Sequence, residues 1–85
     1  MIIEARTAAD HEVIAVRFDE MAAEASRRAE THKRMAESYR RIGGEGVRNW
    51  EFEQHCNQIA AAAESDARFY RRIADGHRSM ASKLK

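Results

Sequence analysis

The chain has 85 residues and a formal net charge of +1, with 15 basic and 14 acidic residues interleaved along it. This length allows one small domain, residues 1–85, and the lack of a basic face argues against nucleic-acid binding. No apolar run approaches the ~20 residues that a membrane span needs, so we expect a soluble protein without membrane insertion. We expect it to be periplasmic if a signal peptide was removed and cytoplasmic otherwise.

The first predicted element is a helix over about residues 8–42. Thr7 and Asp10 are spaced as a capping box that starts a helix. Alternating steps of three and four then define one stripe, which is typical of a helix that packs along a coiled-coil seam. The stripe contains His11, Ile14, Phe18, Met21, Ala25, Arg28, His32, Met35, Tyr39 and Ile42.

The glycine-rich segment 43–49, GGEGVRN, predicts the turn. Gly43 or Gly44 can take the left-handed conformation that closes a helix, and Asn49 can cap the next one. Val47 and Trp50 would then cover the turn end or form a small exposed patch that docks a partner protein.

The second predicted helix covers about residues 50–83. Its stripe follows the same steps of three and four without a slip. It contains Phe52, Cys56, Ile59, Ala63, Asp66, Tyr70, Ile73, His77, Met80 and Leu84. Two such helices predict an all-α fold, a long antiparallel helical hairpin.

Alanines form a second stripe beside the first in both predicted helices. They recur at every seventh residue, and a shift of 45 residues superimposes the two sets, which indicates an internal repeat. We expect these small residues to form much of a homodimer contact, which would complete a four-helix bundle. The alanines are Ala15, Ala22, Ala29, Ala36, Ala60, Ala67, Ala74 and Ala81.

Side-chain size indicates a register in which facing residue numbers sum to about 94 or 95, so that large side chains face small ones. Phe18 then faces His77. Arg28, the one cation of the first stripe, faces Asp66, the one anion of the second. We expect these two residues to form a buried ion pair that disfavours slipped registers.

Several residues of the stripes could bind a soft or borderline metal. His32 and Met35 are separated by three residues, as are His77 and Met80, so each pair shares a helix face. With Cys56, this set would suit copper, zinc or a haem iron. The alternative is that all five are ordinary core residues without a cofactor.

The remaining reactive side chains point to no catalytic centre. Cys56 would face Tyr39 as a buried thiol, and His55 would be exposed beside the stripe. His11 and His77 would lie one or two layers apart near the open end of the hairpin. No serine has a histidine and an acid at suitable spacing, so we expect a protein that is not an enzyme.

The chain resembles a group of small bacterial helical-hairpin proteins of uncharacterised function. The resemblance rests on Ala9-Asp10-His11, Met35-Ala36, His55-Cys56, Ile73-Ala74 and the repeated His-x-x-Met-Ala, and it covers residues 9–81. Members often carry an export signal, which implies a periplasmic home. The most favoured function is a non-enzymatic helical bundle with a structural or binding role. The alternatives are a soft-metal or haem protein and a partner-docking module.

Overall fold

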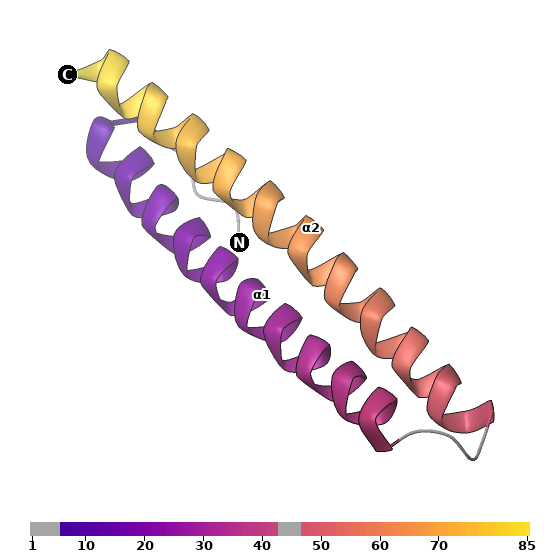
Figure 1. Cartoon of the computed structure of the whole chain (residues 1–85). Coiled ribbons are helices and arrows are strands. Elements are labelled where there is room, and N and C mark those ends of the chain that lie inside the picture. The colour runs from indigo at the N-terminus through magenta and orange to yellow at the C-terminus, as the bar shows by residue number, and fades with distance from the viewer. Residues whose placement is uncertain (1–5, 43–46) are drawn as a thin grey trace.

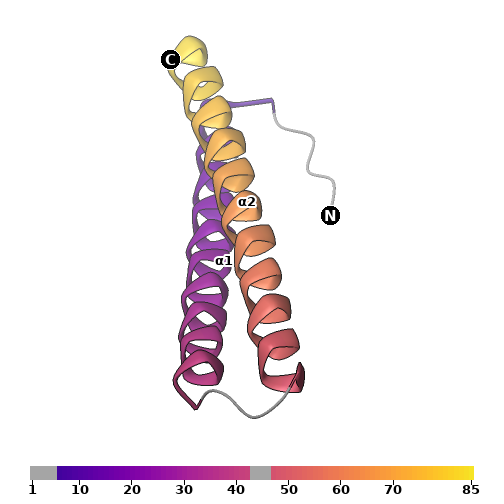
Figure 2. The same ribbon diagram turned by 45° about the vertical axis from the view of Figure 1, so that its right-hand side comes forward.

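The computed structural model describes residues 6–42 and 47–85, and these form two long helices. Helix α1 spans Ala8–Ile42 and helix α2 spans Val47–Leu84. The helices run antiparallel and lie side by side along their whole length (Figures 1 and 2). The hairpin is a thin rod of 61 × 18 × 12 Å, so the predicted all-α hairpin is confirmed.

The start of α1 is set by the predicted capping box. Thr7 Oγ1 accepts a hydrogen bond from the backbone N–H of Asp10 at 3.1 Å, and the Asp10 carboxylate accepts one from the N–H of Thr7 at 3.2 Å. The N–H of Arg6 donates to the same carboxylate oxygen. Donation by the backbone of Arg6 and then of Thr7 lowers the pKa of Asp10.

Helix α2 begins earlier than predicted. Asn49 was expected to cap it, but the helix begins at Val47 and Asn49 lies within its first turn. Neither Val47 nor Arg48 is a helix breaker, so the helix extends back to the last glycine of the turn. The predicted left-handed closure at Gly43 or Gly44 lies outside the described residues.

The two helices meet along a narrow line that we call the alanine seam. The predicted alanines lie on it and are almost completely buried, with exposed fractions of 3% or less. Larger or cysteine side chains and two further alanines fill the alternate positions, and all of these are buried or half-buried. The seam contains His11, Ala15, Phe18, Ala22, Ala25, Ala29, His32, Ala36 and Tyr39 of α1 and Cys56, Ala60, Ala63, Ala67, Tyr70, Ala74, His77 and Ala81 of α2.

Two expectations about this interface are therefore wrong. The alanines are not available for a dimer contact, because each helix of the hairpin buries the alanines of the other. The seam also replaces half of the predicted stripe: Ile14, Met21 and Met35 give way to the alanine that follows each of them. Small side chains occupy these positions because they let the helix axes approach closely along the full length of the rod.

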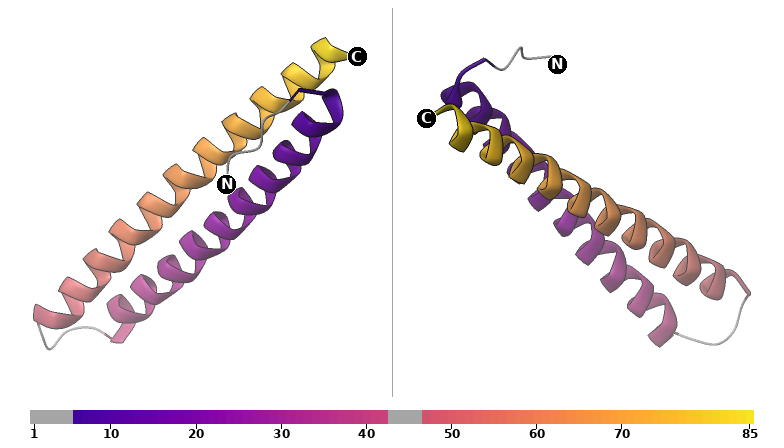
Figure 3. Two further views of the ribbon diagram at one scale, coloured as in Figure 1. Left: turned by 180° about the vertical axis from the view of Figure 1, so that it is seen from behind. Right: turned by 90° about the horizontal axis from the view of Figure 1, so that it is seen from above.

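The predicted register holds at the open end of the seam. Phe18 stacks on His77, with their rings nearly parallel at 9° and their centroids 6.4 Å apart. Tyr39 contacts Phe52 near the turn, at 5.3 Å between centroids. The first contact is the predicted pairing, whereas Tyr39 was predicted to face Cys56, one turn further along α2. The two helices stay alongside each other from the open end to the turn (Figure 3).

Candidate functional site

One edge of the seam is charged. It consists of every seventh residue from Glu12 on α1 and from Asn57 on α2, and opposite charges meet there across the hairpin. We call it the charged edge: Glu12, Asp19, Ser26, Lys33 and Arg40 of α1 and Asn57, Glu64, Arg71, Arg78 and Lys85 of α2.

The contacts across the charged edge hold the helices in register. Asp19 pairs with Arg78 and Lys33 pairs with Glu64. These ion pairs occupy equivalent places, because Glu64 follows Asp19 by 45 residues and Arg78 follows Lys33 by the same number. The contact with Glu64, first through its hydrogen bond and then through its charge, raises the pKa of Lys33, and Lys33 lowers the pKa of Glu64 in the same way.

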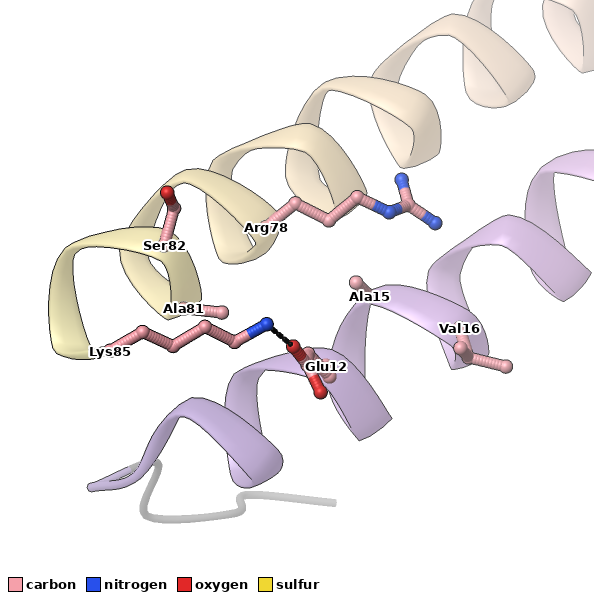
Figure 4. A pocket seen from close by; sticks show the side chains of 7 residues that line it. All are labelled: Glu12, Ala15, Val16, Arg78, Ala81, Ser82 and Lys85. Carbon is pink, nitrogen blue, oxygen red and sulfur yellow. Dashed lines mark ion pairs between the residues drawn. The ribbon is translucent and has the colours of Figure 1, made fainter.

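The charged edge carries a shallow pocket at the open end of the hairpin. Lys85 Nζ lies 2.8 Å from Glu12 Oε1 across its mouth, and Arg78 closes the other side (Figure 4). Ala15 and Ala81 point into the space between the helices at its floor. Glu12 and Lys85 pair with each other, and Arg78 pairs with Asp19 and Asp75, so the charged groups that line the pocket are already engaged within the chain.

The opposite edge is apolar. It consists of every seventh residue from Ile14 on α1 and from Phe52 on α2, and its large side chains are half-buried or exposed. We call it the apolar edge: Ile14, Met21, Arg28, Met35 and Ile42 of α1 and Phe52, Ile59, Asp66, Ile73 and Met80 of α2.

Arg28 and Asp66 lie in the middle of the apolar edge and are both exposed. No ion pair within 4.0 Å joins them, so the expected buried pair inside the hairpin is wrong. The cause is the same shift that moved the seam by one residue. Their positions flank the interface, and water reaches both charges.

The five residues predicted as metal ligands do not come together in one chain. His77 contacts Phe18 of α1, whereas His32 lies 14 residues further along that helix, which places the two histidines ~21 Å apart at 1.5 Å per residue. Met35 and Met80, which accompany them, are separated in the same way. Among residues 6–42 and 47–85, no group of three or more His, Cys, Asp or Glu side chains could hold a metal ion.

The structure instead brings together a pair of histidines at the open end. His11 Nδ1 and His77 Nδ1 are 2.8 Å apart, which is hydrogen-bond distance. His11 is 4% exposed, and the ring of Phe18 covers His77 and contacts Tyr70 in turn. The sequence placed the two histidines near each other but did not single out His11, because spacing within one helix cannot reveal a partner on the other.

The other reactive side chains lie apart from this pair. Cys56 is buried with 7% of its surface exposed, as expected, and His55 is exposed. His32 is half-buried, and its Nδ1 has no hydrogen-bond partner. Trp50 is 62% exposed near the turn, so it does not cover the end of the rod.

Comparisons with known proteins found nothing similar to this chain. No family model matches the chain, and neither does any curated protein or solved structure. Among the described residues, no helix is long and apolar enough to cross a membrane. The resemblance to uncharacterised bacterial hairpin proteins therefore stays a prediction.

Proposed function

We propose that the chain is a non-enzymatic protein that works as a homodimeric four-helix bundle, with a structural or binding role. The apolar edge is the observation that carries this proposal. It runs from Ile14 and Met80 at the open end to Ile42 and Phe52 near the turn, and within the described residues its large side chains stay half-buried or exposed. The alanines of the hairpin are already buried on its own seam, so its large apolar side chains need a second surface to become buried.

The exposed area of this edge is large enough to favour association. Ile59 is 46% exposed and Met80 49%, and other large side chains on the edge are similarly open. Covering the open half of one such side chain contributes on the order of 1 kcal/mol. Each chain has eight large apolar side chains on its apolar edge. Burying them together contributes a hydrophobic free energy comparable to the ~4–15 kcal/mol that association costs.

The charges on the apolar edge favour a second copy of this chain as the occupant. Arg28 lies ten residues after Phe18, and Asp66 lies eleven residues before His77, so the two charges are at nearly the same height along the rod. One cation and one anion in the centre of an otherwise apolar surface are self-complementary. A copy turned by a two-fold axis presents the same pair in exchanged positions.

The charges also select the direction of the two-fold axis. An axis along the rod lays α1 of each chain over α2 of the other, so Arg28 meets the partner's Asp66. An axis across the rod lays α1 over α1, so Arg28 meets the partner's Arg28. Like charges in a desolvated interface are costly, and we therefore infer a bundle with both turns at the same end.

Charge reversal tests the pairing between chains. Arg28→Asp places four acidic groups at the centre of the dimer, and Asp66→Arg places four basic ones. We expect each variant alone to sediment as a monomer of about half the wild-type mass, and an equimolar mixture to recover a heterodimer. Val16→Asp, on an exposed side chain away from the apolar edge, is the control and should remain dimeric. A wild-type chain that stays monomeric at high concentration rules out the dimer.

A spin label at Arg41→Cys in a Cys56→Ala background tests the direction of the axis. Turns at the same end bring the two labels close together, whereas opposite turns separate them by a distance approaching the 61 Å length of the rod. A long distance in a stable dimer would overturn the orientation but leave the dimer standing.

A further inference from the structure

The geometry points to a Cu(I) site made by His11, His77 and Met80 at the open end of the hairpin. The inference goes beyond the proposed dimer and does not depend on it, because all three side chains belong to one chain. It also differs from the ligand set predicted from the sequence, since His11 replaces the distant His32.

Two imidazole nitrogens already converge. His11 Nδ1 of α1 and His77 Nδ1 of α2 are 2.8 Å apart, and at most one of them carries a proton in that contact. Metal–nitrogen bonds of ~2.0 Å need the two atoms ~3.3–4 Å apart, so the rings must separate by about 1 Å. Moving the one Nδ1 proton to Nε2 of its own ring leaves both imidazoles neutral and frees both Nδ1 atoms as ligands.

Met80 supplies the third ligand. It lies three residues after His77 and so shares a face of α2 with it. It also lines a surface hollow together with His11, Arg6, Lys83 and Leu84. The thioether is half exposed and has freedom to turn toward the histidine pair.

The charge around the pair favours a monovalent soft ion. Arg6 and Lys83 line the hollow, and the carboxylate of Asp10, which precedes His11 in the sequence, is already engaged by the backbone N–H groups of Arg6 and Thr7. Two neutral imidazoles and a thioether leave the charge of the ion uncompensated, which penalises Zn²⁺ and Cu(II) more than Cu(I). Thioether and imidazole ligands are also a set that suits Cu(I).

A competition titration against a chromogenic Cu(I) chelator, under anaerobic conditions, tests the site. Cys56→Ala serves as the parent, because a thiol elsewhere on the seam would bind Cu(I) by itself. We expect one Cu(I) per chain, and a loss of Cu(I) affinity of at least ~100-fold in His11→Asn and in His77→Asn. A loss of this size exceeds the effect of removing a residue that only supports a metal ligand. His55→Asn, on an exposed histidine, is the matched control and should bind as the parent does.

X-ray absorption of the copper-loaded parent keeps the test decisive if a histidine variant unfolds. We expect two nitrogen neighbours and one sulfur, with the sulfur absent in Met80→Leu, which keeps an apolar side chain of similar volume. A parent that binds no Cu(I), a site without sulfur, or unchanged binding in folded His11→Asn would each overturn the inference.

Discussion

The charged edge and the apolar edge flank the same seam but differ in how far their side chains are matched within one chain. On the charged edge, Asp19 pairs with Arg78 and Lys33 pairs with Glu64, so its polar groups are matched within one chain. On the apolar edge, the large side chains stay open and Arg28 and Asp66 remain unpaired with each other. Charges of the first edge are matched within the hairpin, whereas the large side chains of the second edge are left open by it.

This difference shows how two adjacent stripes divide two tasks. The alanines allow close approach over many turns, which gives a long but thin interface of small contacts. The larger residues beside them have more area to bury and less need of close approach. The hairpin therefore uses the small stripe internally, and we propose that the large stripe serves association.

Overpacking the seam is the strongest way to break the comparison. Ala67 is 2% exposed, and Ala67→Leu forces the helices apart at the middle of the rod, which we expect to cost about 3 kcal/mol of unfolding free energy. Ala62→Leu, on an exposed alanine of the same helix, should leave stability nearly unchanged. Urea unfolding measures both. Equal midpoints for the two variants would contradict the position of the seam.

A charge on the apolar edge should separate the hairpin from the dimer. We expect Ile59→Glu to weaken dimerisation by at least ~100-fold, about 2.7 kcal/mol, because the dimer would bury two unpaired carboxylates. The helix content of each chain should persist, since Ile59 lies outside the seam. Sedimentation equilibrium and circular dichroism measure the two effects. Val13→Glu, on an exposed side chain away from the apolar edge, should change neither.

Removal of the helix cap should have a smaller, local effect. Thr7→Ala deletes the oxygen that accepts from the Asp10 N–H, and we expect a loss of about 1 kcal/mol, with fraying at the end that carries His11. Thr31→Ala removes a hydroxyl that bonds to the Arg27 carbonyl in the middle of α1, and it should cost less. Hydrogen exchange of the first turn distinguishes the two variants.

The charged edge should matter least, and pH should reveal it. The pKa of Glu64 is lowered by Lys33 in the folded chain, so its contribution is present above the ordinary carboxyl pKa and is lost as pH falls through the lowered value. Lys33 has a raised pKa, and its contribution is lost only as pH rises through that value. We expect the melting temperature to fall on acidification below about pH 4, and to fall less in Glu64→Gln. Identical pH profiles would show that this pair contributes nothing.

Much of the fold could be predicted from local chemistry. The capping box at Thr7 and Asp10 sets the start of α1, and the steps of three and four located both helices. The contact of Phe18 with His77 also followed from matching large side chains to small ones. The predicted start of α2 was wrong by three residues. The prediction relied on the capping preference of Asn49 and did not consider that the residues before it are compatible with a helix.

The candidate site was predicted only in part. His77 and Met80 were identified because residues three apart on a helix must be neighbours. His32 and Met35 were grouped with them through their shared motif, but the antiparallel arrangement sends the two motifs to different heights of the rod. His11 was missed as their partner because its proximity depends on the contact between helices.

The sequence by itself determined that this chain forms two amphipathic helices, where they begin and end within a few residues, and that they fold back on each other, because periodicity and capping act over a few neighbours. Only the tertiary structure decided which of two adjacent stripes the helices share. Both stripes are apolar enough to be buried, and the choice depends on how closely two backbones approach when alanines meet along the whole rod. That choice exposed Arg28 and Asp66, opened the apolar edge and brought His11 against His77.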